Sequence, residues 1–172
     1  IDDGDDLEEE TDDVDIDAGD TEKLTLEFNV PLILEDDTYD FTLTIIGEDD
    51  NNLAFDKTET YQIEISKDKH SVKLIKAELS PAEVSCTRRA SINVEMMNIG
   101  QKDEDVSLYI KSTELGIAQY SNFTLDADAS DSDNEYSNSF AFDINKVIAV
   151  GSYPVVTKIT YDDSKKSQEL TS

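Results

Sequence analysis

An alternation of apolar and polar residues with a period of two runs along most of the chain after residue 20 and constrains its fold more than any other feature. The first such run covers residues 24–30 and stops at Pro31, which cannot donate to a strand ladder. A period of two places successive side chains on opposite faces of a strand, whereas an amphipathic helix repeats about every 3.6 residues. The pattern therefore predicts strands that bury one face and expose the other.

Further alternating runs follow at intervals of about 10–18 residues. They cover residues 39–45, 61–65, 72–77, 92–96, 106–110, 120–125, 140–144 and 153–161. Turn-rich segments such as 47–52 separate them, and the best helix candidate, 114–119, is at most one turn long. Short strands separated by turns predict an all-β chain that folds as antiparallel sandwiches.

Two segments match without a gap when the chain is shifted by 114 residues (140 − 26). Residues 26–45 then align with 140–159, their alternating apolar positions coincide, and Tyr39 meets Tyr153. Each copy reads as a strand, a loop of about eight residues, a tyrosine and a second strand. A tyrosine just before a strand resembles the tyrosine corner of immunoglobulin-like sandwiches, in which the hydroxyl pins the incoming loop.

The repeat also predicts the domain organisation. We expect an acidic loop or arm over 1–20, the C-terminal half of an immunoglobulin-like sandwich over 21–66, a linker over 67–70, and a sandwich over 71–172 whose last strand is cut short. In the second copy about four strands precede the matched motif, whereas in the first only the acidic block does. We therefore expect tandem sandwiches of which the first is incomplete, its missing strands belonging to a longer modular chain or to a neighbouring subunit.

Charge excludes several classes of function. The chain has 41 Asp and Glu against 14 Lys and Arg, a net charge of -27, and residues 1–20 contain twelve acids and no base. Such a chain repels nucleic acid and anionic lipid, and no apolar run approaches the roughly 18 residues of a membrane span. We expect no nucleic-acid partner and no membrane insertion of this segment. For the acidic block two interpretations stay open, a solvated arm and a cation-dependent contact surface.

No arrangement of residues points to catalysis. The chain has one His and one Cys, which excludes a disulfide framework and the usual zinc sites. Cys86 lies beside two arginines but has no neighbouring base, and His70 lies in the linker. We predict that the protein is not an enzyme, that Cys86 is a buried, inert thiol with intermolecular pairing as the alternative, and that His70 is a solvated linker residue.

Calcium is the one cofactor for which the sequence offers ligands, because hard cations bind several converging oxygen atoms. The richest segment, 126–135, supplies Asp126, Asp128, Asp131 and Asp133, and 47–52 is a second acidic segment. An EF-hand needs Gly at position 6 and Glu at position 12, but counting from the first of these aspartates those positions hold Asp and Ser. An ordered calcium site and a solvated turn both remain open.

One sequon is present. Asn122-Phe123-Thr124 matches N-x-[ST], which predicts Asn122 as a glycan site if the protein is displayed outside the cell.

Several motifs follow one another in the second half of the chain. They are Leu79-Ser80-Pro81 before a strand, Asn98-Ile99-Gly100 at the end of one, the acidic turn 103–106, and Gly151-Ser152-Tyr153. In this order they resemble a unit of archaeal S-layer-like surface proteins, within the immunoglobulin-like adhesion modules that include the CARDB (cell-adhesion-related) domain. The resemblance covers about residues 21–172 and carries no catalytic residue. It implies a secreted, modular, structural protein of a cell-surface coat or appendage.

The leading hypothesis is therefore a non-enzymatic extracellular building block of a cell-surface layer, sheath or filament, whose copies associate through sandwich edges. The alternative is an adhesion module that recognises carbohydrate or a partner-cell protein, although the chain has no Trp for sugar stacking. An acidic enzyme from a high-salt organism is a third class, supported by composition alone.

Overall fold

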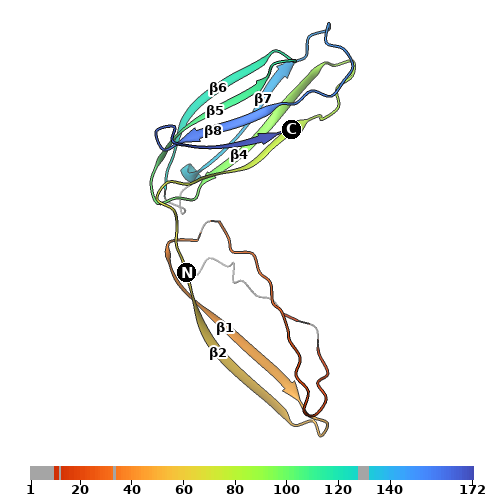
Figure 1. Ribbon diagram of the computed structural model, residues 1–172, viewed down its shortest axis with the longest axis vertical. Helices are drawn as coiled ribbons and strands as arrows, with labels where there is room; N and C mark the ends of the chain where they lie inside the picture. The colour runs from red at the N-terminus through yellow and green to blue at the C-terminus, as the bar shows by residue number, and fades with distance from the viewer. Residues whose placement is uncertain (1–9, 12, 33, 128–131) are drawn as a thin grey trace. The chain divides into compact units, whose positions relative to one another are not determined.

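The computed structural model describes residues 10–11, 13–32, 34–127 and 132–172 (Figure 1). The chain divides into two compact units, residues 1–34 and 35–172. In the first unit the described residues form neither helix nor strand, and the second unit holds every strand of the described chain. The described part is therefore all-β, as the sequence predicts, while the expected domain boundaries stay predictions.

Nine strands and one short 3₁₀ turn make up the regular structure of the described residues. They are β1 (Asp37–Glu48), β2 (Ala54–Ile65), β3 (Val72–Ser80), β4 (Arg89–Asn98), β5 (Glu104–Ser112), β6 (Ile117–Leu125), η1 (Ser132–Asn134), β7 (Glu135–Asp143), β8 (Val156–Tyr161) and β9 (Lys166–Thr171). Strands β1 and β2 form a hairpin. The others form two antiparallel sheets of order β3-β4-β7 and β6-β5-β8-β9, which are the layers of a sandwich.

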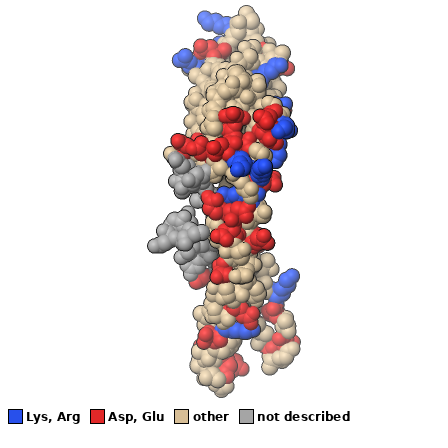
Figure 2. Space-filling view, turned by 90° about the vertical axis from the view of Figure 1, so that its left-hand side faces the viewer, with Lys and Arg blue, Asp and Glu red and all other residues tan. Residues whose placement is uncertain are grey.

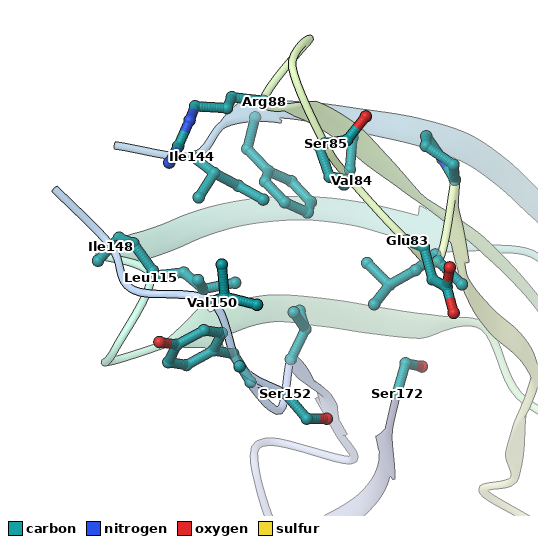
Figure 3. Close-up of a pocket in the computed structure, with 18 of the residues that line it drawn as sticks. Glu83, Val84, Ser85, Arg88, Leu115, Ile144, Ile148, Val150, Ser152 and Ser172 are labelled. Carbon is teal, nitrogen blue, oxygen red and sulfur yellow. The ribbon is translucent and has the colours of Figure 1, made fainter. Parts of the chain in front are cut away.

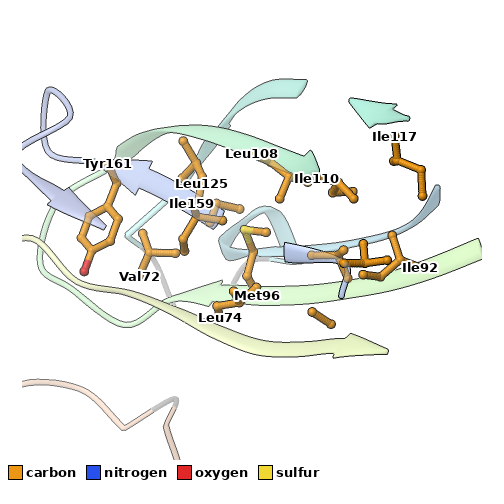
Figure 4. Close-up of a cluster of buried hydrophobic side chains, with 14 residues drawn as sticks. Val72, Leu74, Ile92, Met96, Leu108, Ile110, Ile117, Leu125, Ile159 and Tyr161 are labelled. Carbon is orange, nitrogen blue, oxygen red and sulfur yellow. The ribbon is translucent and has the colours of Figure 1, made fainter. Parts of the chain in front are cut away.

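The core lies between these two layers (Figure 4). Every second residue of a central strand points inward, which is the geometry that the period of two predicts. Six such residues of β4 and β5 are at most 1% exposed, namely Ile92, Val94, Met96, Val106, Leu108 and Ile110. The buried apolar residues of the described chain all fall between 72 and 161, so the core belongs to the sandwich.

The strand predicted over residues 24–30 is wrong, because these residues pair with no sheet. At the repeat spacing of 114 they correspond to 138–144, most of which belongs to β7, and β7 is held by its ladder to β4. Alternation alone cannot make a strand, since its N–H and C=O groups need a ladder partner.

Candidate functional site

The sheet edges are the part of this fold best suited to bind another chain, because an edge strand presents a row of unpaired N–H and C=O groups. In the described chain the outer strands are β1 and β2 of the hairpin, β3 and β7 of one layer, and β6 and β9 of the other. These six edges differ in how they are protected.

The edge of β3 is covered by side chains of β9. Gln168 Oε1 accepts a hydrogen bond from Leu74 N at 2.9 Å, and Gln168 Nε2 donates to Val72 O. Two residues earlier on the same face of β9, Lys166 Nζ donates to His70 O at 2.6 Å. A single glutamine amide thus bonds β3 as a neighbouring strand would, and backbone groups that another chain could bind are satisfied within the sandwich.

The edge of β7 receives one hydrogen bond from β6, at the opposite edge of the four-stranded layer. Gln119 of β6 donates through Nε2 to Ala141 O of β7 at 3.0 Å. Each edge of the three-stranded layer therefore receives a glutamine from the four-stranded layer.

Charge distinguishes the remaining edges. Strand β2 contains Asp56, Lys57, Glu59 and Glu64, and β9 contains Lys166 and Glu169. Charged side chains on an edge strand oppose its pairing with another strand. By contrast, residues 42–46 of β1 (TLTII) and the whole of β6 (IAQYSNFTL) contain no charged residue. Residues 136–142 of β7 are also uncharged, so β1 and β6 stand out only among the described edges that receive no glutamine.

The two tyrosines of the repeat make equivalent hydrogen bonds. Tyr39 OH donates to Glu35 O at 3.2 Å, and Tyr153 OH donates to Ala149 O at 2.9 Å. The acceptors, like the donors, are 114 residues apart (149 − 35 and 153 − 39). The predicted pinning of the incoming loop by each hydroxyl is therefore confirmed, although Tyr39 lies within β1 and Tyr153 lies three residues before β8.

The linker that leads into β3 is hydrogen-bonded to the loop between β4 and β5. Gln101 N donates to Asp68 O at 3.1 Å, and Ile99 N donates to Ser71 O at 2.9 Å. Gly100 lies between these two bonds, where a Cβ atom would come within 2.6 Å of Ser71 N. The close approach requires glycine, and it fixes the path by which the chain enters the sandwich.

His70 belongs to this joint, so the prediction that it is a solvated linker residue is wrong. Its Nδ1 lies 2.6 Å from Oε1 of Glu104, whose side chain is only 2% exposed. The other oxygen of that carboxylate, Oε2, accepts a hydrogen bond from Asp162 N at 2.9 Å. Burial of a carboxylate is costly unless such donors reach it. The pair therefore joins the linker to β5 and to the turn between β8 and β9.

The predicted calcium site stays a prediction, because Asp128 and Asp131 lie outside the described residues. At the base of the same loop Asp126 N donates to Asp133 O at 3.1 Å. In the part of the chain that the structure describes, no three His, Cys, Asp or Glu side chains are grouped as metal ligands.

The second acidic segment forms the turn of the β1–β2 hairpin. Asp49 Oδ1 accepts hydrogen bonds from Leu53 N and Asn51 N, both at 2.9 Å. These donors, Leu53 first, hold the pKa of the Asp49 carboxyl below its ordinary value. This carboxylate therefore has a structural role in closing the turn.

Asn122 lies on the exposed side of β6, where an attached sugar would meet solvent. Its Oδ1 accepts a hydrogen bond from Ser107 Oγ at 2.8 Å. The position is compatible with a glycan, and glycosylation stays a prediction.

Cys86 is exposed, so the prediction of a buried, inert thiol is wrong. It lies in the loop between β3 and β4, outside any ladder that would turn alternate side chains inward. This loop lines an open groove of about 1050 Å³ at one end of the sandwich (Figure 3). Apolar residues of the segment between β7 and β8, including Ile144, Ile148 and Val150, line the same groove.

We expect the Cys86 thiol to react fully with a water-soluble disulfide reagent while the protein is folded. Reaction should release one coloured thiolate of the reagent per chain without denaturant, because the exposed sulfur of Cys86 is within its reach. Colour development in native buffer, compared with that in 6 M guanidinium chloride, measures the accessible fraction. Reaction only after denaturation would contradict the exposed position.

No protein-family model matches the chain, and no curated protein is similar to it. In the described residues no helix is long and apolar enough to cross a lipid bilayer. The edges, the repeated tyrosine bonds and the linker joint are therefore the features from which a function can be argued.

Proposed function

We propose that the protein is a non-enzymatic extracellular structural protein, a modular building block of a cell-surface layer, sheath or filament whose copies associate through sheet edges. The contrast among the edges carries this proposal. Glutamines bond to backbone groups of β3 and β7, charged residues lie on β2 and β9, and β1 over 42–46 and β6 have neither feature. Four of the six edge strands therefore have a feature that opposes pairing, and two do not. This difference suits a protein whose copies associate at defined positions.

An immunoglobulin-like identity for the sandwich supports the modular part of the proposal. Layers of order β3-β4-β7 and β6-β5-β8-β9, with a tyrosine corner just before β8, are features of that architecture. The second tyrosine bond, 114 residues earlier, fits a chain of tandem modules. The motif order that resembles archaeal S-layer-like proteins points to the same class.

The hydrogen-bonded linker supports a load-bearing role. Backbone bonds from Ile99 and Gln101, and the contact of His70 with buried Glu104, fasten the chain where it enters the sandwich. A linker rich in Gly and Ser would leave its modules free to reorient. A fastened linker instead transmits force along the chain, as a coat or filament subunit requires.

The charge of the chain makes a testable prediction about assembly. At a net charge of -27 copies repel one another, and the screening length falls from about 10 Å at 0.1 M salt to about 3 Å at 1 M. We therefore expect larger assemblies at high protein concentration and high salt, measured by sedimentation velocity over a concentration series. A chain that stays monomeric, folded and protease-resistant at every concentration and salt level would overturn the proposal.

One observation favours the adhesion alternative. The rings of Tyr109 and Tyr120 lie side by side across β5 and β6, with centroids 4.8 Å apart, and both side chains are exposed. Paired aromatic rings on an open sheet face offer a stacking surface for a sugar ring. This function requires no self-association, so a monomer that binds saccharide in the same experiments would favour it.

A further inference from the structure

We infer that residues 42–46 of β1 in one copy pair with the outer edge of β6 in a second copy, so that copies join head to tail. This inference rests on the proposed function and names the contact by which assembly occurs. It follows from the composition of the edges, from the internal repeat, and from the edges that are already closed.

The outer edge of β1 corresponds to an edge that the same chain does pair. By the shift of 114 residues, 42–46 correspond to 156–160 of β8, and these pair with β5 over Ser107–Lys111. The run Thr-Leu-Thr-Ile-Ile has the β-branched composition that favours strands. Ile45 is 50% exposed and Ile46 is 78% exposed. Because it lacks charge and is rich in β-branched residues, this edge is suited to pairing with another strand.

The outer edge of β6 is equally unprotected. The strand pairs with β5 over all nine residues without a register shift, and its sequence has no charge and no Pro. Figure 2, which views the protein from the side on which β6 lies in Figure 1, shows an uncharged area on the sandwich bordered by acidic and basic residues. A second acidic copy can approach this edge with less repulsion than it meets at β2 or β9.

Pairing of β1 with β6 suits the two edges better than pairing of β6 with β6 of a second copy. The joined sheet would have the order β2-β1-β6-β5-β8-β9, and six strands lie within the usual range of about 4–6. Two β6 edges would instead give eight strands and leave the hairpin two-stranded, which is marginally stable in water. Because each copy carries one edge of each kind, the β1–β6 contact can repeat from copy to copy, as a heterologous interface does in a ring or filament.

Two variants of the full chain, each with one edge blocked, test the contact. Thr44→Glu places a charge on β1, and Asn122→Glu places one on β6. All proteins are made in a host without N-glycosylation. Thr58→Glu and Ser167→Glu are matched controls, since they add the same charge to strands β2 and β9, whose edges are already charged. Circular dichroism and thermal melts of all four variants verify that they remain folded.

We expect the wild type and both controls to assemble alike, and Thr44→Glu and Asn122→Glu each to be monomeric alone. An equimolar mixture of these two should give a dimer and nothing larger, because it contains one open β1 edge and one open β6 edge. Dimers of either variant alone, or a mixture that stays monomeric while the wild type assembles, would overturn the β1–β6 contact. If both variants assemble like the wild type, another surface mediates assembly and the proposed function survives. A monomeric wild type would overturn the proposed function itself.

Discussion

Replacing Ile92 by Ala is expected to lower the free energy of unfolding by about 2–5 kcal/mol. Ile92 is fully buried in β4, the central strand of its layer, and its ladder partners are Leu79 and Phe140. Truncation removes its dispersion contacts and leaves a cavity that strands held by ladders on both sides cannot close. Urea denaturation followed by far-UV circular dichroism, at a concentration where the chain is monomeric, measures the change.

Ile46→Ala is the matched control for this prediction. The same side-chain atoms are removed, but Ile46 is exposed on the hairpin, so the free energy of unfolding should change by no more than about 0.5 kcal/mol. If the two substitutions had equal effects, stability would not be concentrated in the sandwich core, and the assignment of the core to the two layers would be contradicted.

The period of two made most of the fold predictable. It places Ile92, Val94 and Met96 on one face of a strand, and these side chains are buried in β4. The same period misleads over 24–30, because it describes the face that a strand would bury and not whether a partner strand is available. Sequence periodicity is local, whereas the ladder that makes a strand depends on residues far along the chain.

The protection of the edges could not be predicted in this way. Gln168 and Leu74 are 94 residues apart in sequence, and Gln119 and Ala141 are 22 apart. Nothing in the neighbourhood of either glutamine indicates where its amide will bond. The tyrosine bonds, in contrast, were predictable because each hydroxyl reaches only four residues back along the chain and the repeat shows the motif twice.

For the linker joint the sequence does contain a signal. Glu104 continues the inward-facing series of β5 that includes Val106 and Leu108. An acid at an inward position of a strand needs a buried partner, and the one His of the chain is the natural candidate. For Cys86, residue type alone favours burial, but the loop around it lacks strand alternation and the thiol is exposed.

His70→Ala is expected to lower the free energy of unfolding by about 1–3 kcal/mol, because it removes a hydrogen-bond partner from the buried carboxylate of Glu104. The bond from Lys166 Nζ goes to the backbone oxygen of residue 70 and survives the substitution, so the loss reports on the imidazole. Lys69→Ala changes the neighbouring exposed residue and should have an effect within about 0.5 kcal/mol.

A double-mutant cycle with Glu104→Gln measures the coupling energy of His70 and Glu104 apart from the effect that each substitution has by itself. If His70 and Glu104 interact as the 2.6 Å distance indicates, the two substitutions should be less costly together than the sum of their single effects, with a coupling of about 0.5–3 kcal/mol. Urea denaturation of the four proteins at one fixed pH gives this coupling. Strict additivity would mean that the contact does not stabilise the joint, and the linker would then be held by the backbone bonds of Ile99 and Gln101 and by the bond from Lys166 Nζ to His70 O.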